Sequence, residues 1–116
     1  MSNLLKQVAK NSQPKPKHNQ EQLQQMESLL MAAVDAHGMG ELGKAATLYG
    51  EILNIEPNHF DALHLLGLAA HQSGNPYDAL KMIDKALEVR QDISDAYSNK
   101  SSVLMELARF EEALIA

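Results

Sequence analysis

The sequence repeats itself with a period of 34 residues. At this offset the segment GELGKAA (40–46) aligns with GNPYDAL (74–80), which in turn aligns with ARFEEAL (108–114). Histidine recurs as well, because His37 is followed 34 positions later by His71. A tandem unit of this length is a supersecondary element that buries its apolar face only against its neighbours. The period therefore predicts a stack of similar units.

Each unit reads as two helices, and the middle copy shows this best. Pro57 stops the preceding helix, and Asn58 and Asp61 have the spacing of an N-terminal cap followed by an acid. This pattern predicts a helix over about residues 59–73, which Gly74 ends. Its apolar residues recur at spacings of three and four, as in an amphipathic helix with a wide buried face.

The second helix of the middle copy is expected over about residues 76–89. Asn75 is expected to cap it, and proline takes its first position, where a missing N–H costs little. Three small residues, Gly67, Ala79 and Ala86, stand where the two helices are expected to approach each other. A larger side chain there would push the helices apart.

The chain changes character near residue 18. Residues 1–18 hold four lysines, two prolines and no acid, which predicts a flexible basic arm. Within the arm, the segment SNLLKQVAK (2–10) is either a short helix or disordered. Asn19 and Gln22 have the spacing of a capping box, so the first repeat helix is expected to begin near residue 19. The helical domain, 19–116, holds six Lys plus Arg against fifteen Asp plus Glu, a net charge of −9.

These features resemble the tetratricopeptide repeat (TPR), a 34-residue helix hairpin with the signature W-x2-L-G-x2-Y, then A-x3-F, then P. The resemblance covers about residues 26–116. The first copy has two alanines in place of Leu-Gly, and the third has Lys-Ser there. The matching residues are Leu63, Leu66, Gly67, Ala70, Ala79 and Ile83 in the middle copy, with Gln91 where Pro is usual, and Ala45, Tyr49 and Pro57 in the first.

The resemblance implies an all-α fold in which antiparallel helix hairpins stack as a right-handed α-solenoid. The repeats are expected at about 26–59, 60–93 and 94–116, the last of them truncated. In the third copy, Glu111 and Glu112 are expected in the first turn of a second helix that is too short to be stable by itself. We therefore expect a fragment of a longer protein with an open apolar end, which is a candidate surface for self-association.

Composition argues against several classes of function. The chain has no cysteine, which excludes disulfides, iron–sulfur centres and thiolate zinc sites. Its acidic body has no basic patch with interleaved aromatic residues, as nucleic-acid binding requires, and no segment has the ~20 apolar residues of a membrane span. No catalytic constellation and no phosphate-binding glycine loop is present. We expect a cytoplasmic protein with no catalysis of its own, no cofactor, no nucleic acid and no membrane partner.

Two histidines in the segment DALHLLGLAAHQSG (61–74) raise the question of a metal site. His64 and His71 are expected about 10.5 Å apart along one helix axis, on one face. Helical zinc ligands stand three or four residues apart, so a metal would need a ligand from a neighbouring helix, for which His37 is the candidate. We interpret the histidines as partly exposed lining residues and expect no metal. Asn99 is expected to hydrogen-bond between helices.

In the TPR family the first helices of successive repeats line a concave groove that holds an extended peptide or a partner helix. The resemblance therefore implies a protein-interaction scaffold that binds a protein or peptide. Several segments are also similar to the N-terminal repeats of bacterial proteins in which TPRs precede a glycosyltransferase domain, so the alternative is a segment that recruits substrate for such an enzyme. The groove residues implied by the resemblance are Glu27, Leu30, Val34, His37, Asp61, His64, Leu68, His71, Gln72, Asp95, Ser98, Ser102 and Met105.

Overall fold

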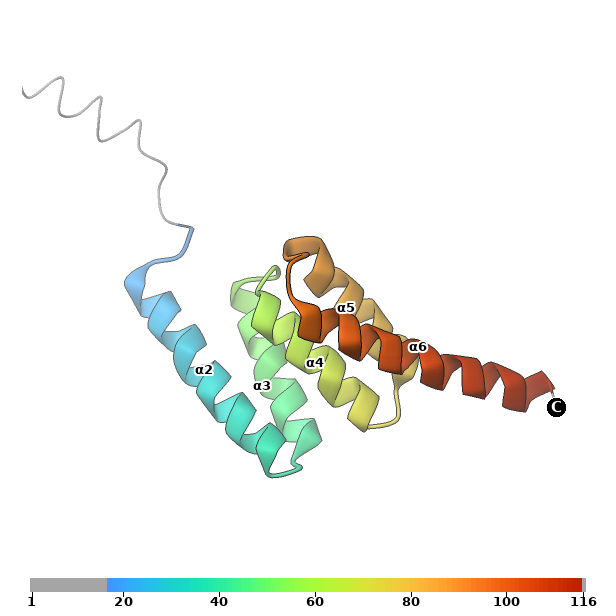
Figure 1. Cartoon of the computed structure of the whole chain (residues 1–116). Coiled ribbons are helices and arrows are strands. Elements are labelled where there is room, and N and C mark those ends of the chain that lie inside the picture. Colours follow the sequence, from blue (N-terminus) through green and yellow to red (C-terminus); the bar gives the residue numbers. More distant parts are fainter. Residues whose placement is uncertain (1–16, 116) are drawn as a thin grey trace, which may run out of the picture.

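The computed structural model describes residues 17–115, and this part of the chain is a stack of helices without a strand. Consecutive helices are joined by short turns and pack in chain order, each against the next (Figure 1). The predicted all-α solenoid of helix hairpins is confirmed. Its helices are α2 (Gln20–Gly38), α3 (Leu42–Ile55), α4 (Phe60–Gln72), α5 (Pro76–Val89) and α6 (Ser94–Ile115).

Helix α2 begins at the predicted capping box. The backbone N–H of Gln22 donates to the side-chain oxygen of Asn19 at 2.7 Å, and the N–H of Asn19 donates to the side chain of Gln22 at 3.2 Å. Two backbone donors that the helix leaves unpaired are thereby satisfied. The predicted arm, including segment 2–10, lies almost entirely outside the described residues.

Helix α4 begins one residue later than predicted, and its cap is not Asn58. The N-cap is His59, whose Nδ1 accepts a hydrogen bond from the backbone N–H of Ala62 at 3.1 Å. Asn58 lies in the preceding turn. The unprotonated imidazole nitrogen therefore accepts the backbone hydrogen bond that the side-chain oxygen of Asn accepts at other helix N-termini.

Helix α5 has the predicted bounds but not the predicted side-chain cap. Asn75 occupies the N-cap position and makes no capping hydrogen bond with its side chain, whereas Pro76 takes the first helical position. The turn before it depends on Gly74, which has a φ of +83°, and the corresponding turn of the first hairpin contains Gly40 at +80°. A side chain at either position would be strained.

The first helix of the third repeat does not end where the corresponding helices of the first two repeats end. Helix α6 runs without a break to Ile115, so Glu111 and Glu112 lie in its last turns and not in the first turn of a new helix. The physical reason is local: the third copy has Ala108-Arg109-Phe110 where the second has Gly-Asn-Pro. None of these three residues favours a positive φ or lacks an N–H, so the helix continues.

The apolar core consists of two clusters that meet at α4. The first lies between α2 and α3 and includes Tyr49 and Ile52, and the second lies between α5 and α6 and includes Ile83 and Val103. These four are the largest fully buried side chains. Helix α4 contributes Ala62 to the first cluster and packs Phe60 and Ala70 against the second.

Gly67 marks the closest approach of the two helices in the second hairpin, as predicted. A Cβ built at this position would lie 2.8 Å from Ile83 Cγ1 and 3.2 Å from the backbone oxygen of Ala79. Ala79 and Ala86 on α5 are fully buried. The small residues therefore allow α4 and α5 to pack closely.

The end of α6 is open. Leu114 and Ile115 are 81% and 86% exposed, and Phe110 lines an open hollow of about 270 Å³ together with residues 74–78 at the start of α5. Within residues 17–115, no helix combines the length and the apolar character that crossing a membrane requires.

Candidate binding surface on helices α2, α4 and α6

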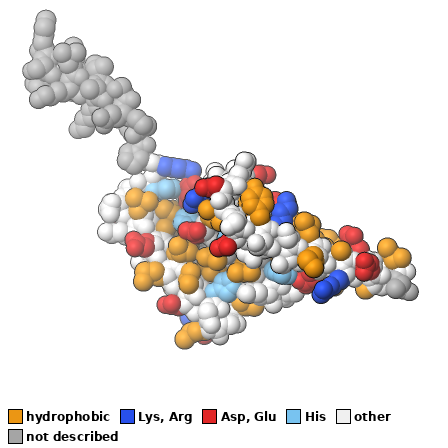
Figure 2. Space-filling view, in the orientation of Figure 1, with side chains coloured by type: hydrophobic (Ala, Val, Ile, Leu, Met, Phe, Trp, Pro, Cys, Tyr) orange, Lys and Arg blue, Asp and Glu red, His pale blue; other side chains and the backbone are white. Residues whose placement is uncertain are grey.

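The predicted groove residues lie on three helices that are side by side in the stack. Helix α2 carries Leu30, Val34 and His37, and side-chain contacts join it to α4 and join α4 to α6. In this view hydrophobic, acidic and histidine side chains mix over the surface (Figure 2). Exposed members of the set are Glu27, Val34, Asp61, Gln72, Asp95, Ser98, Ser102 and Met105, and the half-buried members are Leu30, His37, His64, Leu68 and His71.

His37 joins the first two hairpins. Its Nε2 lies 2.6 Å from Oε1 of Gln72 on α4, and its Nδ1 lies 2.9 Å from the hydroxyl oxygen of Tyr49 on α3. Because the Gln72 oxygen only accepts, the consistent arrangement is that Nε2–H donates to Gln72 and Nδ1 accepts from the Tyr49 hydroxyl. Burial raises the pKa of Tyr49, so its hydroxyl keeps its proton.

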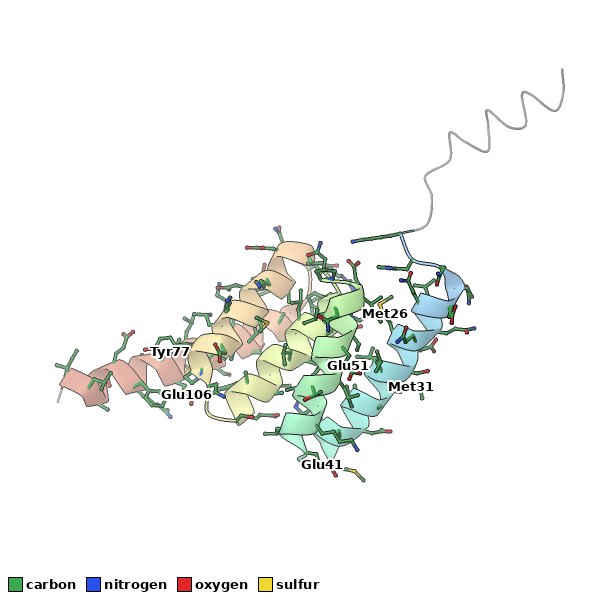
Figure 3. The ribbon with its side chains drawn as sticks, turned by 180° about the vertical axis from the view of Figure 1, so that it is seen from behind. Met26, Met31, Glu41, Glu51, Tyr77 and Glu106 are labelled. Atoms are coloured by element: carbon green, nitrogen blue, oxygen red, sulfur yellow. The ribbon has the colours of Figure 1, made fainter. Side chains whose placement is uncertain are left out.

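His64 and His71 both join α4 to α6. The side-chain nitrogen of Asn99 lies 2.7 Å from His64 Nε2, which confirms the predicted interhelical hydrogen bond of Asn99. His71 Nε2 pairs with the carboxylate of Glu106, which Figure 3 labels on α6. The histidines are therefore contacts between neighbouring hairpins, a role that the sequence prediction missed.

All three contacts join residues that are 35 positions apart, one more than the repeat period. Equivalent residues of successive repeats lie at the same place on parallel helices, and one further residue turns the side chain by 100° around the helix. This rotation turns the partner side chain toward the preceding helix. His37 with Gln72 and His71 with Glu106 are thus the same contact used twice.

These contacts also bear on the metal hypothesis. Each of the three histidines already has a protein partner at Nε2. Over residues 17–115, no three His, Asp or Glu side chains gather closely enough to hold a metal ion.

The exposed side chains that remain form two rows across the three helices. One row is acidic, with Glu27, Asp61 and Asp95 at equivalent positions of successive repeats. The charges of Asp95 and Asp61 both raise the pKa of the His64 imidazole, so each carboxylate lies within electrostatic range of this side chain. The second row lies two turns along the helices and contains Val34, which is 47% exposed, and the half-buried Leu68. Ser102 stands at the equivalent position on α6, so the apolar part of this row is confined to α2 and α4. Together the rows make an apolar strip with an acidic border, which we call the acidic-apolar face.

The end of the basic arm is attached close to this face. Lys17 Nζ and His18 Nε2 each lie 2.8 Å from a carboxylate oxygen of Glu56, which precedes α4 by four residues. The Glu56 side chain is only 14% exposed. Hydrogen bonds from Lys17 and, second, from His18 lower the pKa of Glu56, so it stays ionised at neutral pH.

The hydrogen bond from Asn99 to His64 predicts a pH dependence of stability. Burial lowers the pKa of His64 below its usual value of 6.5, against the smaller opposing effect of Asp95 and Asp61. As the pH falls through 6.5, the imidazole of residue 64 becomes protonated in the unfolded chain before it does in the folded one. This contribution to the free energy of unfolding is therefore fully present above about pH 6.5 and decreases as the pH drops toward the folded-state pKa. We expect His64→Gln, whose oxygen still accepts from Asn99, to flatten this fall.

The measurement is urea unfolding at intervals between pH 8 and pH 5. The free energies of unfolding of the wild type and of His64→Gln should change with pH in parallel from pH 8 to 7, where both side chains are neutral, and diverge below pH 6.5. Parallel curves over the whole range would contradict the lowered pKa of His64. Loss of the Glu56 ion pair belongs to a lower pH window, because a carboxylate with a lowered pKa loses its stabilising effect only on protonation.

Comparison with known proteins agrees with this geometry. Stacked hairpins with small residues at their crossings define a helical-repeat solenoid. The tetratricopeptide repeat sequence model matches residues 36–103, more than half of the chain. The chain belongs to the tetratricopeptide repeat family, whose repeats generally mediate protein–protein interactions.

Solved structures show the same fold. A mutant of the Thermobaculum terrenum O-GlcNAc transferase matches 75% of this chain with 25% sequence identity and a TM-score of 0.72. A tetratricopeptide repeat protein from Parabacteroides merdae matches 75% of this chain with 28% identity and a TM-score of 0.67. The chain covers 17% of the first protein and 34% of the second. In both, the similarity is confined to a helical-repeat segment of a longer protein.

Proposed function

We propose that this chain is a protein-interaction scaffold that binds a basic peptide on the acidic-apolar face. The observation that carries the proposal is the repetition of exposed side chains at equivalent positions, with the acids Glu27, Asp61 and Asp95 beside the apolar residues Val34 and Leu68. The histidines that were predicted to line the surface join neighbouring helices, so they hold the helices that carry these acidic and apolar side chains in fixed relative positions.

The spacing of the rows defines the peptide that would fit. Packed helices lie about 8–10 Å apart, so equivalent residues of successive repeats are separated by about that distance. A polyproline II segment advances about 3.1 Å per residue, or about 9 Å for three. An extended peptide with Lys at every third position and apolar residues between would therefore place one ammonium near each acid and its apolar side chains on the strip.

The test is the affinity of such a peptide, Lys-x-x-Lys-x-x-Lys with Leu or Val between the lysines, measured by fluorescence anisotropy. We expect Asp61→Asn combined with Asp95→Asn to weaken binding by about tenfold, since each exposed ion pair contributes up to ~1 kcal/mol. Binding of the wild type should weaken as salt screens the charges.

Glu51→Gln combined with Glu88→Gln is the matched control for this double variant. Both residues are exposed carboxylates, Glu51 on α3, where Figure 3 labels it, and Glu88 on α5. The pair changes the net charge by the same two units without touching the acidic-apolar face. Equal losses from the control and the face variants would mean that only overall charge matters, and the proposed site would be wrong.

A second function is favoured by the similarity to the Thermobaculum terrenum O-GlcNAc transferase. On this proposal the chain is the substrate-recruiting repeat segment of a bacterial, cytoplasmic glycosyltransferase, and it orients a protein substrate without taking part in the chemistry. The test is the encoded sequence after Ala116. A nucleotide-sugar-binding domain there would support the proposal, and an immediate stop codon would refute it.

A further inference from the structure

The charge of the basic arm, and the place where it joins the helices, suggest what occupies the acidic-apolar face in the free protein. Residues 1–16 carry Lys6, Lys10 and Lys15 and no acid, whereas residues 19–116 carry a net charge of −9. The arm also contains apolar residues, Leu4, Leu5 and Val8, between and beside its lysines. Its composition is therefore that of the basic, partly apolar peptide for which the face is suited.

The arm is attached to the helices near the acidic end of the face. Lys17 and His18 are held to Glu56, in the turn that leads into α4, and Asp61 lies in the first turn of that helix. Sixteen extended residues reach up to about 50 Å, whereas packed helices lie about 8–10 Å apart. The arm can therefore cross all three helices without strain.

We propose that residues 1–16 dock on the acidic-apolar face of their own chain and compete there with an incoming basic peptide. The lysines of the arm lie against Asp61, Asp95 and Glu27, and its apolar residues lie on the strip formed by Val34 and Leu68. Because the arm is tethered, its effective concentration at the face is in the millimolar range even when each contact is weak. The competition rests on the proposed function, but the docking itself does not.

The docking is tested without any external ligand. Because the chain has no cysteine, the single variant Ser2→Cys carries one nitroxide spin label at the end of the arm. In ¹⁵N-labelled protein we expect paramagnetic broadening of amides in the first turns of α4 and α6 and along α2, relieved in 1 M NaCl. Broadening confined to residues next to Lys17 would overturn the proposal. So would broadening of the same amides when spin-labelled ¹⁴N protein is mixed with ¹⁵N protein that carries no spin label, because it would place the arm on a second copy.

A charge-matched pair of variants separates specific docking from general attraction. Lys6→Gln combined with Lys10→Gln should remove the broadening, whereas Lys81→Gln with Lys85→Gln, on α5, should leave it in place. Equal loss in both pairs would overturn the proposal, because it would show that only the net charge matters.

Deletion of residues 1–16 then tests the competition. We expect the shortened chain to bind the Lys-x-x-Lys-x-x-Lys peptide about tenfold more tightly than the full chain. Equal affinity of the two chains for the peptide would overturn the competition. Broadening of the face by the arm, with no peptide binding to either chain, would support the docking and refute the proposed function instead.

Discussion

Replacement of Gly67 by Val is expected to lower the free energy of unfolding by about 3 kcal/mol, because it inserts a side chain where two helices are in close contact. The Cβ of the new residue would lie 2.8 Å from Ile83 Cγ1 and 3.2 Å from a backbone oxygen. Ile83 is fully buried and stiff at its branched carbon, so it cannot move aside without disturbing the second core cluster. Thermal unfolding monitored by circular dichroism should show a decrease in Tm of about 10 °C or more.

Gly50→Ala is the matched control for this variant. Gly50 lies within α3, and a Cβ built there meets nothing within 4 Å. Alanine should therefore stabilise the chain by about 0.5–1 kcal/mol, because it favours the helix over the unfolded state. If Gly67→Val proved as harmless as this control, the close approach of α4 and α5 would be wrong.

The period of 34 residues predicted the fold almost completely, for a physical reason. A repeated unit keeps much of its apolar spacing, its turn residues and its small contact residues from copy to copy, so the copies support one another. The prediction was wrong where a copy had drifted. At Ala108-Arg109-Phe110 the helix-breaking residues are gone, and the period suggested a turn that the local sequence does not support.

The candidate site was harder to predict than the fold. The candidate residues lie on α2, α4 and α6, and the sequence treated His37, His64 and His71 as lining residues, whereas each also joins two hairpins. The partners Tyr49 and Glu106 were not considered, because a contact between helices is not visible in the pattern of either helix alone. A signal for it exists in the offset of 35, which becomes meaningful only once the helices are known to lie parallel.

The two core clusters imply that the ends of the stack are held together by α4 and by the contacts at the offset of 35. In a linear stack, stability is close to a sum of unit and interface contributions. Loss of packing in one hairpin should therefore lower the stability of that hairpin more than the stability of the other. The first hairpin offers the sharper test, because one residue, Tyr49, is both fully buried and hydrogen-bonded to His37.

Tyr49→Ala is expected to cost about 3–5 kcal/mol, as for other large buried aromatic residues. The loss should be local: amide hydrogen exchange should lose protection through α2 and α3, while α5 and α6 keep theirs, because Ile83 and Val103 remain packed in the second cluster. Tyr49→Phe keeps the ring and removes only the hydroxyl that His37 Nδ1 accepts from, so it should cost about 1 kcal/mol with no change in the pattern. Uniform loss of protection in Tyr49→Ala would mean that the two clusters unfold as one unit, and that the contacts across α4 are stronger than the packing within either hairpin.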